Sequence, residues 1–269
     1  MKKNISIVLV IVLFSVLVVG CSQSEGVSED LNVLKVGATP VPHGELLELI
    51  KEDLAEKGIT LEILEFTDYV KPNLALKDEE IDANFFQHLP YLENFNEENN
   101  LDLVSVGTVH VEPLGLYSEK IDNIELLKEG STIAIPADSV NGGRALILLE
   151  TAGLIELSEG AGLEATEEDI IINEKKLKFK AIEAAQIPRV LQDIDAGIIN
   201  GNYAIEAGIN PIEDHLLLEG AESPYANIIT TRKDNKDDAS IKVLLEALRS
   251  EKVRKYIREN YNGGVVPTF

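Results

Sequence analysis

A regular alternation of extended and helical patterns in the first third of the chain constrains the fold more than any other feature. Three short apolar segments are predicted strands: residues 33–38, 61–66 and 81–86. Residues 45–57 place most of their leucines and an isoleucine on one helical face, and Gly58 follows where a left-handed C-cap belongs. Pro72 suits the first turn of a helix before the third strand. The order β-α-β-α-β implies a parallel sheet with helices on its faces.

The same alternation starts again after an interruption. Pro113-Leu114-Gly115 breaks an extended segment. Further strands are predicted at residues 132–135, 177–182 and 196–199. Residues 227–231 are extended again, and we expect them to return the chain to the first sheet. Two α/β lobes are therefore predicted, the first from residues 33–115 and 228–269 and the second from residues 116–227.

The first 20 residues have the pattern of a secretory signal peptide. A short basic start precedes an apolar run, residues 5–19, which is short for a membrane span. The sequence Val18-Val19-Gly20-Cys21 resembles a bacterial lipobox, in which the cysteine is lipidated and becomes the mature N-terminus, although a smaller residue than Val19 is usual. The alternative is a plain signal sequence with an incidental cysteine. Cys21 is the only cysteine in the chain, which favours the lipobox.

Residues 21–32 form a predicted lipidated tether, because acyl chains on Cys21 would anchor the exported chain to a membrane. Two α/β lobes on an exported and tethered chain are typical of the two-lobed periplasmic-binding-protein (type 2) fold, in which a hinge closes the lobes around a ligand. The formal charge of −23, from 24 basic and 47 acidic residues, argues against binding to nucleic acid or to an anionic membrane surface.

Residues 65–91 concentrate aromatic side chains in a chain that is only 5% aromatic. Four candidates for a binding pocket stand near the ends of the two predicted strands around this stretch: Tyr69, Phe86, His88 and Tyr91. In open α/β sheets, ligands bind outside the carboxyl ends of the strands. Core packing is the alternative for any single ring, but two aromatic and polar strand ends in succession favour a pocket.

Arg144 is the strongest polar candidate. It follows two glycines at a predicted helix start, where free backbone N–H groups favour an anion, and a guanidinium holds a carboxylate by two parallel bonds. The alternative is an ordinary surface arginine. Asn202 follows a predicted strand and Asn227 begins one, and either amide has groups that bind an ammonium or a carboxylate. Their alternatives are an N-cap for Asn202 and a turn residue for Asn227.

Recognisable metal and catalytic motifs are missing from the sequence. The four histidines, His43, His88, His110 and His215, show no metal-helix spacing, and no cysteine remains to join them. There is no G-x-S-x-G elbow, no Walker A motif and no H-E-x-x-H motif. We therefore expect no metal site, no cofactor and no enzymatic activity.

Eight motifs follow one another along the chain: VGATPVPHGELLE, FTDYVKPNLAL, DANFFQHLPYL, VSVGTVHVEPLGLYS, GGRALILLE with AGLI, INGNYAIEAG, SPYANII and VVPTF. With them, residues 35–269 resemble the NlpA-type lipoprotein family, the methionine-binding lipoproteins of ABC importers. The resemblance implies binding of methionine, L or D, between the lobes and its delivery to a membrane permease coupled to an ATPase. It also implies an exported protein held at the membrane by an N-terminal lipid. The sequence leaves the oligomeric state open, and a monomer is the simplest expectation.

The resemblance also implies a role for each aromatic candidate. Tyr69, Phe86 and Tyr91 would wrap the thioether side chain of the ligand, and His88 would stand beside the same pocket. Aromatic rings suit a thioether because sulfur–ring contacts are favourable.

The remaining three candidates would hold the polar end of the ligand. Arg144 would bind the carboxylate, and Asn202 and Asn227 would hold the rest of that end. Two alternatives stay open. One is a receptor for another small amino acid, a methionine-containing dipeptide or an organic anion in the same fold, and the other is a lipoprotein enzyme or adhesin that reuses the fold.

Overall fold

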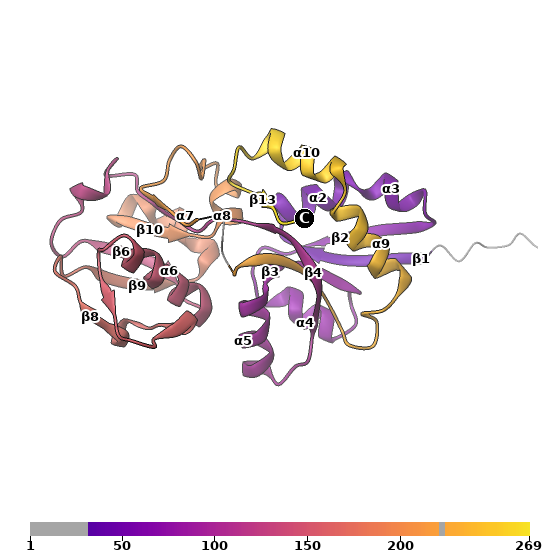
Figure 1. Ribbon diagram of the computed structural model, residues 1–269, viewed down its shortest axis with the longest axis horizontal. Coiled ribbons are helices and arrows are strands. Elements are labelled where there is room, and N and C mark those ends of the chain that lie inside the picture. The colour runs from indigo at the N-terminus through magenta and orange to yellow at the C-terminus, as the bar shows by residue number, and fades with distance from the viewer. Residues whose placement is uncertain (1–31, 221–223) are drawn as a thin grey trace, which may run out of the picture. The chain divides into compact units, whose positions relative to one another are not determined.

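The structure is a computed structural model that describes residues 32–220 and 224–269, which belong to one unit, Asn32–Phe269. The predicted signal peptide, Cys21 and nearly all of the predicted tether lie outside the described residues. The unit contains two lobes, each built on one sheet with helices on both faces (Figure 1).

The two sheets hold most of the strands in the described residues. The six-stranded sheet has the order β13-β4-β12-β3-β1-β2 and comprises β1 (Asn32–Ala38), β2 (Ile59–Glu65), β3 (Ala83–His88), β4 (Val104–Val111), β12 (Ala226–Thr231) and β13 (Val266–Pro267). The five-stranded sheet has the order β11-β5-β10-β6-β9 and comprises β5 (Gly115–Tyr117), β6 (Thr132–Pro136), β9 (Lys178–Ile182), β10 (Ala196–Ile199) and β11 (Leu217–Leu218). A separate pair joins β7 (Glu156–Leu157) to β8 (Ile170–Ile172). The chain passes from the first sheet to the second between β4 and β5 and returns between β11 and β12.

Helices cover both faces of both sheets. The α-helices are α2 (Glu45–Leu49), α3 (Lys51–Ala55), α4 (Lys71–Lys77), α5 (Leu89–Asn99), α6 (Ser139–Thr151), α7 (Ile187–Val190), α8 (Gly201–Glu206), α9 (Ala239–Leu248) and α10 (Glu251–Asn260). A π-helical turn, η1 (Pro40–Gly44), leads into α2, and single 3-10 turns include η3 (Gly162–Glu164) and η4 (Glu167–Asp169).

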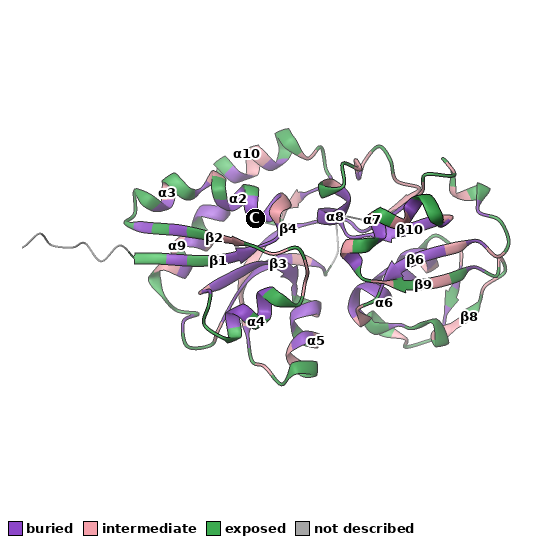
Figure 2. Ribbon diagram, turned by 180° about the vertical axis from the view of Figure 1, so that it is seen from behind, coloured by how far each residue is buried: buried purple, intermediate pink, exposed green. Residues whose placement is uncertain are grey.

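Each sheet separates two apolar cores. In the first lobe, α2, α3, α9 and α10 pack on one face of the six-stranded sheet, and α4 and α5 on the other (Figure 1). In the second lobe, α6 covers one face of the five-stranded sheet, and α7 and α8 cover the other. Ile133 and Ile135 of β6 enter the first of these cores, and Ala134 between them enters the second, because successive strand side chains point to opposite faces. Buried positions accordingly lie along the sheets and on the inner sides of the helices (Figure 2).

The alternation predicted from the sequence is confirmed in both lobes. β1 pairs in parallel with β2 and β3, as expected, whereas β12 runs antiparallel to β3 and β4, so the first sheet is mixed. The helix predicted over residues 45–57 is present over most of that range, but it is not continuous. The backbone at Ile50 (φ −95°, ψ 0°) departs from regular helical geometry and divides it into α2 and α3.

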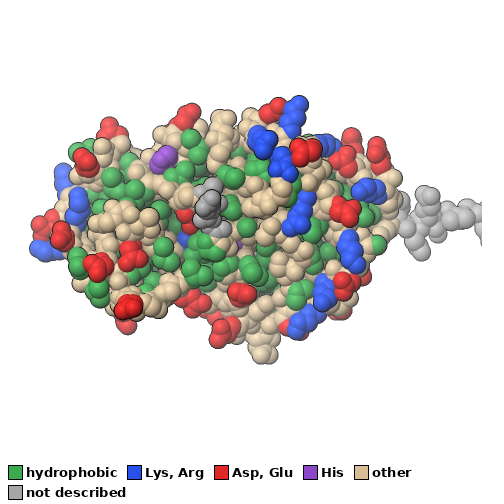
Figure 3. Space-filling view, viewed as in Figure 1, with side chains coloured by type: hydrophobic (Ala, Val, Ile, Leu, Met, Phe, Trp, Pro, Cys, Tyr) green, Lys and Arg blue, Asp and Glu red, His purple; other side chains and the backbone are tan. Residues whose placement is uncertain are grey.

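Acidic residues are spread along the sequence, and acidic side chains are likewise spread over the surface of the described residues (Figure 3). Acidic side chains are scattered over the face seen in Figure 3, with lysine and arginine side chains among them. Within residues 32–220 and 224–269, none of the helices combines the length and the apolar character that crossing a bilayer requires.

The start of α6 differs from the prediction. The glycines before Arg144 were expected to form a turn that opens the helix, but α6 already begins at Ser139, with Asp138 as its N-cap. The Asp138 carboxylate accepts a hydrogen bond from the backbone N–H of Asn141 at 2.8 Å. Arg144 therefore lies in the second turn of α6, beyond the free N–H groups of the helix end.

Gly143 allows α6 to approach the backbone of the segment that contains η3. A Cβ atom at this position would lie 2.3 Å from the backbone oxygen of Leu163 and 2.8 Å from the backbone nitrogen of Ala165. Both contacts are to backbone, which a rotamer change does not relieve. The glycine therefore serves close packing between two segments of the second lobe.

The substitution Gly143→Ala is expected to lower the free energy of unfolding by about 1–3 kcal/mol, the usual cost of overpacking a core. Urea denaturation of the purified soluble chain measures the change. Gly220→Ala is the matched control, since a Cβ atom there meets nothing within 4 Å, and its effect should stay within about 0.5 kcal/mol. Equal stability of the two variants would contradict the close-packing role of Gly143.

Candidate ligand-binding site

The seven candidate residues line one cavity between the two lobes, which we call the interlobe cavity. Its walls are formed by Tyr69, Phe86, Gln87, His88, Tyr91, Glu112, Asn141, Arg144, Asn200, Gly201, Asn202 and Asn227. Most of these residues follow the carboxyl ends of strands, namely β2, β3, β6 and β10. The structure thus brings all seven predicted residues together, at the edge where parallel strands of such sheets commonly present ligand-binding groups.

Aromatic rings form one wall of the interlobe cavity. The ring centroid of Tyr69 lies 5.8 Å from that of Phe86 and 5.9 Å from that of Tyr91. Phe85, the neighbour of Phe86 on β3, points to the other face of the sheet and packs edge-on against His43, with centroids 4.6 Å apart. The alternation of β3 therefore separates one phenylalanine of the cavity from one of the core.

Tyr69 also links the two lobes. Its hydroxyl donates a hydrogen bond of 2.5 Å to Asn202 Oδ1, and its backbone oxygen accepts one of 3.0 Å from the hydroxyl of Tyr91. Asn202 is the second residue of α8, and Asn200 holds the N-cap position, so an N-cap role for Asn202 is wrong. The Nδ2 group of Asn202 is buried and has no hydrogen-bond partner among the described residues. It is therefore a free hydrogen-bond donor in the wall of the cavity.

His88 is a neutral imidazole that caps a helix. Its Nδ1 accepts a hydrogen bond from the backbone N–H of Tyr91 at 3.3 Å at the start of α5, which leaves Nε2 as the donor to Asn141 Oδ1 at 3.3 Å. Burial, reinforced by the positive charge of Arg144, lowers the pKa of His88 to about 3. This side chain is uncharged at neutral pH and contributes hydrogen bonds without ionic attraction.

Arg144 is buried, with 3% of its surface exposed, and it is already paired. Its Nε donates to Glu219 Oε1 at 2.9 Å, and its Nη2 donates to Glu219 Oε2. Nη2 also donates to the backbone oxygen of Glu112 at 2.9 Å, and the guanidinium carbon lies 4.2 Å from the centroid of the Tyr225 ring. The surface-arginine alternative is therefore wrong. Among the described residues, Nη1 is the guanidinium nitrogen that remains for another acceptor.

Asn227 lies in β12 and not in a turn, so its turn alternative is also wrong. Its Oδ1 accepts a hydrogen bond from His43 Nε2 at 3.2 Å, and its Nδ2 donates to Glu112 Oε1 at 3.4 Å. The side chain is 5% exposed. Asn227 thus connects the interlobe cavity to a buried group of two histidines and a glutamate.

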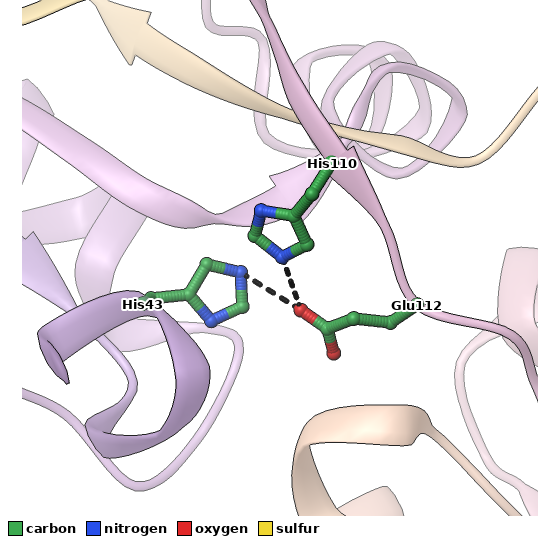
Figure 4. A group of neighbouring side chains, drawn as sticks. All are labelled: His43, His110 and Glu112. Carbon is green, nitrogen blue, oxygen red and sulfur yellow. Dashed lines mark hydrogen bonds and ion pairs between the residues drawn. The ribbon is translucent and has the colours of Figure 1, made fainter. Parts of the chain in front are cut away.

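Figure 4 shows this group, which the sequence did not predict. Glu112 Oε1 lies 3.2 Å from His43 Nε2 and 2.7 Å from His110 Nε2. Thr39 Oγ1 lies 2.8 Å from His43 Nδ1. Burial lowers the pKa of His43 to about 4 and that of His110 to about 3. Burial also raises the pKa of the Glu112 carboxyl group, although neighbouring positive charge and the backbone N–H of Asn202 act in the opposite direction.

The three side chains in Figure 4 have the chemistry of metal ligands, and their ligand atoms lie within 4.8 Å of one another. A metal-bound histidine nearly always donates its second ring N–H to an acceptor. His110 Nδ1 is buried, and no described residue forms a hydrogen bond with it. The arrangement therefore fits a carboxylate that accepts hydrogen bonds from two neutral histidines better than it fits a metal centre.

Sequence reasoning missed five residues of the interlobe cavity: Gln87, Glu112, Asn141, Asn200 and Gly201. Gln87 bonds to the buried amide of Asn73, with Nε2 2.7 Å from Oδ1, and so belongs to the packing behind the wall. Asn141 Oδ1 accepts from Asn200 Nδ2 at 2.9 Å as well as from the histidine of β3. The charge of Glu112 within an otherwise apolar segment was the signal that could have identified it.

A family model described as NlpA lipoprotein matches residues 34–269, which include both lobes and every residue of the interlobe cavity. This chain belongs to the NlpA lipoprotein family. The resemblance stated from the motifs is thereby confirmed.

Individual relatives of this NlpA lipoprotein extend the comparison. The D-methionine-binding lipoprotein MetQ of Salmonella typhimurium is 42% identical over 255 residues, which cover 94% of this chain and 93% of the relative. A nutrient binding protein from Burkholderia cenocepacia bound to methionine has a TM-score of 0.86 and 41% identity, and covers 88% of this chain and 100% of its own. A periplasmic substrate-binding protein of an ABC transporter from Coxiella burnetii has a TM-score of 0.84 and 44% identity, with 87% and 100% covered. The predicted two-lobed substrate-binding fold is confirmed, and these relatives are described as binding proteins.

Proposed function

We propose that this protein is the substrate-binding protein of an ABC importer, that it holds methionine between its lobes and delivers it to a membrane permease, and that it has no catalytic activity of its own. The observation that carries the proposal is the interlobe cavity, where an aromatic wall faces a buried arginine. The methionine-bound relative from Burkholderia cenocepacia and the MetQ relative support the choice of ligand. The lobes of this proposal are residues 33–115 with 228–269, and residues 116–227.

The aromatic wall fits the thioether end of the ligand. Tyr69, Phe86 and Tyr91 surround one side of the interlobe cavity with His88 beside them. Sulfur–aromatic contacts contribute roughly 0.3–1.5 kcal/mol, and burying a methionine side chain contributes roughly 1.5–3 kcal/mol. We assign the ligand side chain to this wall.

The opposite side fits the charged end of an amino acid. Arg144 would bind the ligand carboxylate through Nη1 while Glu219 keeps the other edge of the guanidinium fixed. Asn202 offers a free Nδ2 donor, and Asn227 lines the same side. The carboxylate of an amino acid held in this way is paired with the guanidinium of Arg144, as burial of that charge requires.

Direct identification of the bound ligand tests the function. A soluble chain starting at Ser22 is purified without added amino acids and denatured, and the released small molecule is identified by mass spectrometry. We expect methionine at a stoichiometry close to one, displaced selectively by L- or D-methionine in a competition series over amino acids. Selective displacement by another amino acid, a methionine-containing dipeptide or an organic anion would retain the receptor and change its ligand. No retained molecule and no thermal shift with methionine would contradict the proposal and favour an enzyme or adhesin.

The substitution Arg144→Ala is expected to weaken methionine binding by about 3–5 kcal/mol, because the ligand carboxylate would be buried without its cation. Isothermal titration calorimetry measures the change, and Arg144→Lys separates loss of the charge from loss of the planar group. Arg189→Ala removes an arginine that is exposed and outside the interlobe cavity, and it should bind like the wild type. Near-wild-type affinity of Arg144→Ala would contradict the assignment.

We also propose that Cys21 carries the lipid anchor, on the basis of the lipobox sequence and of relatives described as lipoproteins. In cells, Cys21→Ser is expected to shift the protein from the membrane fraction to the soluble exported fraction, because the acyl chains that hold it are lost. Fractionation followed by immunoblotting measures this shift, with Ser24→Ala as the neighbouring control. Unchanged membrane association of the Cys21 variant would overturn the anchor.

A further inference from the structure

A second cavity lies beside the interlobe cavity, and we call it the outer hollow. Its volume is about 380 Å³. Thr67 lines it from the first lobe, and Tyr203 lines it from the second lobe together with other residues of α7, α8 and the 3-10 turn before α7. The interlobe cavity and the outer hollow have no lining residue in common among the described residues. Side chains must therefore separate the two spaces.

Two stacked tyrosines form this separation. Tyr69 lines the interlobe cavity, and Tyr203 lines the outer hollow. Their ring centroids lie 4.9 Å apart and their planes differ by 29°, so one ring covers a face of the other. Tyr69 follows β2 in the first lobe, whereas Tyr203 belongs to α8 in the second. The stack therefore crosses the boundary between the lobes.

Tyr203 is held in place from two sides. Its side chain is 5% exposed and belongs to the apolar core that contains Ile187 and Leu191. Its hydroxyl donates a hydrogen bond of 3.4 Å to the backbone oxygen of Thr67 in the first lobe. A ring that is packed in one lobe and bonded to the other is a firm support for the ring stacked on it.

The rings of the aromatic wall differ in what lies behind them. Tyr91 stacks on Phe95, with centroids 6.0 Å apart, and Phe86 is 4% exposed within β3. Tyr69 is supported by Tyr203, which itself borders the outer hollow. The wall can therefore yield at Tyr69 once the ring of Tyr203 is removed, because space is then available behind it.

The position of this wall sets the room for the side chain of the proposed ligand. One extra methylene in a closed apolar pocket changes affinity by about 10- to 200-fold. Such a penalty arises because closely packed side chains cannot move aside without strain. Tyr69 meets this condition as long as Tyr203 keeps it from turning toward the outer hollow.

We propose that Tyr203 is a positioning residue that limits the length of the ligand side chain by holding Tyr69 in the aromatic wall. The inference rests on the proposed function and deepens it, because it restricts the ligand class to amino acids with a thioether no longer than that of methionine. Rejection of longer S-alkyl side chains is thus assigned to a ring outside the interlobe cavity.

A comparison of two ligands on two proteins tests this inference. Wild type and Tyr203→Ala are titrated by calorimetry with methionine and with S-butylhomocysteine, which has three more carbons on sulfur and the same amino and carboxylate groups. Wild type should bind S-butylhomocysteine at least about 100-fold more weakly than methionine, and in Tyr203→Ala this ratio should fall below about 10-fold. Methionine itself should bind Tyr203→Ala less than about 10-fold more weakly, since loss of one ring stack has an effect of this size.

Matched variants separate positioning from general loosening of the lobe. Tyr203→Phe keeps the ring and loses the hydrogen bond to Thr67, so it should retain the wild-type ratio. Tyr117→Ala removes a ring that is 1% exposed from the same apolar core and lines neither cavity. It should lower stability and leave the ratio unchanged. Tyr203→Leu keeps apolar volume for folding without a planar ring, and it should lower the ratio if Tyr203→Ala does not fold.

Each outcome decides between the proposals. A wild type that does not bind methionine contradicts the proposed function and the inference with it. A wild type that binds both ligands equally overturns the length limit alone, and this comparison needs no variant. Equal weakening of both ligands by Tyr203→Ala or Tyr203→Leu shows a purely structural ring and also overturns the inference. The same holds if Tyr117→Ala lowers the ratio as much as Tyr203→Ala does.

Discussion

Burial of polar groups is the constraint on which the interlobe cavity depends. A buried polar atom is costly unless it finds a partner, and a buried charge is more costly still. The protein meets this constraint with its own side chains: Arg144 pairs with Glu219, and His88 is satisfied by a backbone N–H and by Asn141. Buried atoms without a partner among the described residues are therefore informative, and two of them, Asn200 Oδ1 and Asn202 Nδ2, lie in the wall of the cavity.

Much of the fold could be predicted because its patterns are local. Strands such as β1 and β6 read as short apolar runs, and their alternation with helices implied the parallel pairing. The residues at which the helices and strands begin and end were harder to predict than the elements themselves. The turn expected at the glycines before Arg144 was wrong because Asp138, upstream of them, caps the helix. Gly143 instead allows α6 to pack closely against the backbone at Leu163, and no local sequence pattern predicts this contact between residues 20 positions apart.

The candidate site was predictable where its residues follow strand ends and not where they depend on distant partners. Tyr69, Phe86 and Arg144 stand in motifs that chemistry or family resemblance identifies. Glu112 owes its position to His110, two residues earlier in the chain, and to His43 in the distant turn η1. No spacing along the chain indicates that His43 meets the other two residues. The same distance effect explains why the metal-ligand chemistry of these three residues was not foreseen.

The bonds between the lobes bear on the rates of ligand exchange. Tyr69 donates to Asn202 across the interlobe cavity, and His88 donates to Asn141 in the same way. Each such bond contributes on the order of 1 kcal/mol to the closed arrangement. Because these bonds must break before the lobes can separate, they oppose the opening that a ligand needs in order to enter the interlobe cavity. The same two hydrogen bonds must also break before an enclosed ligand can leave, so they oppose its release as well as its entry.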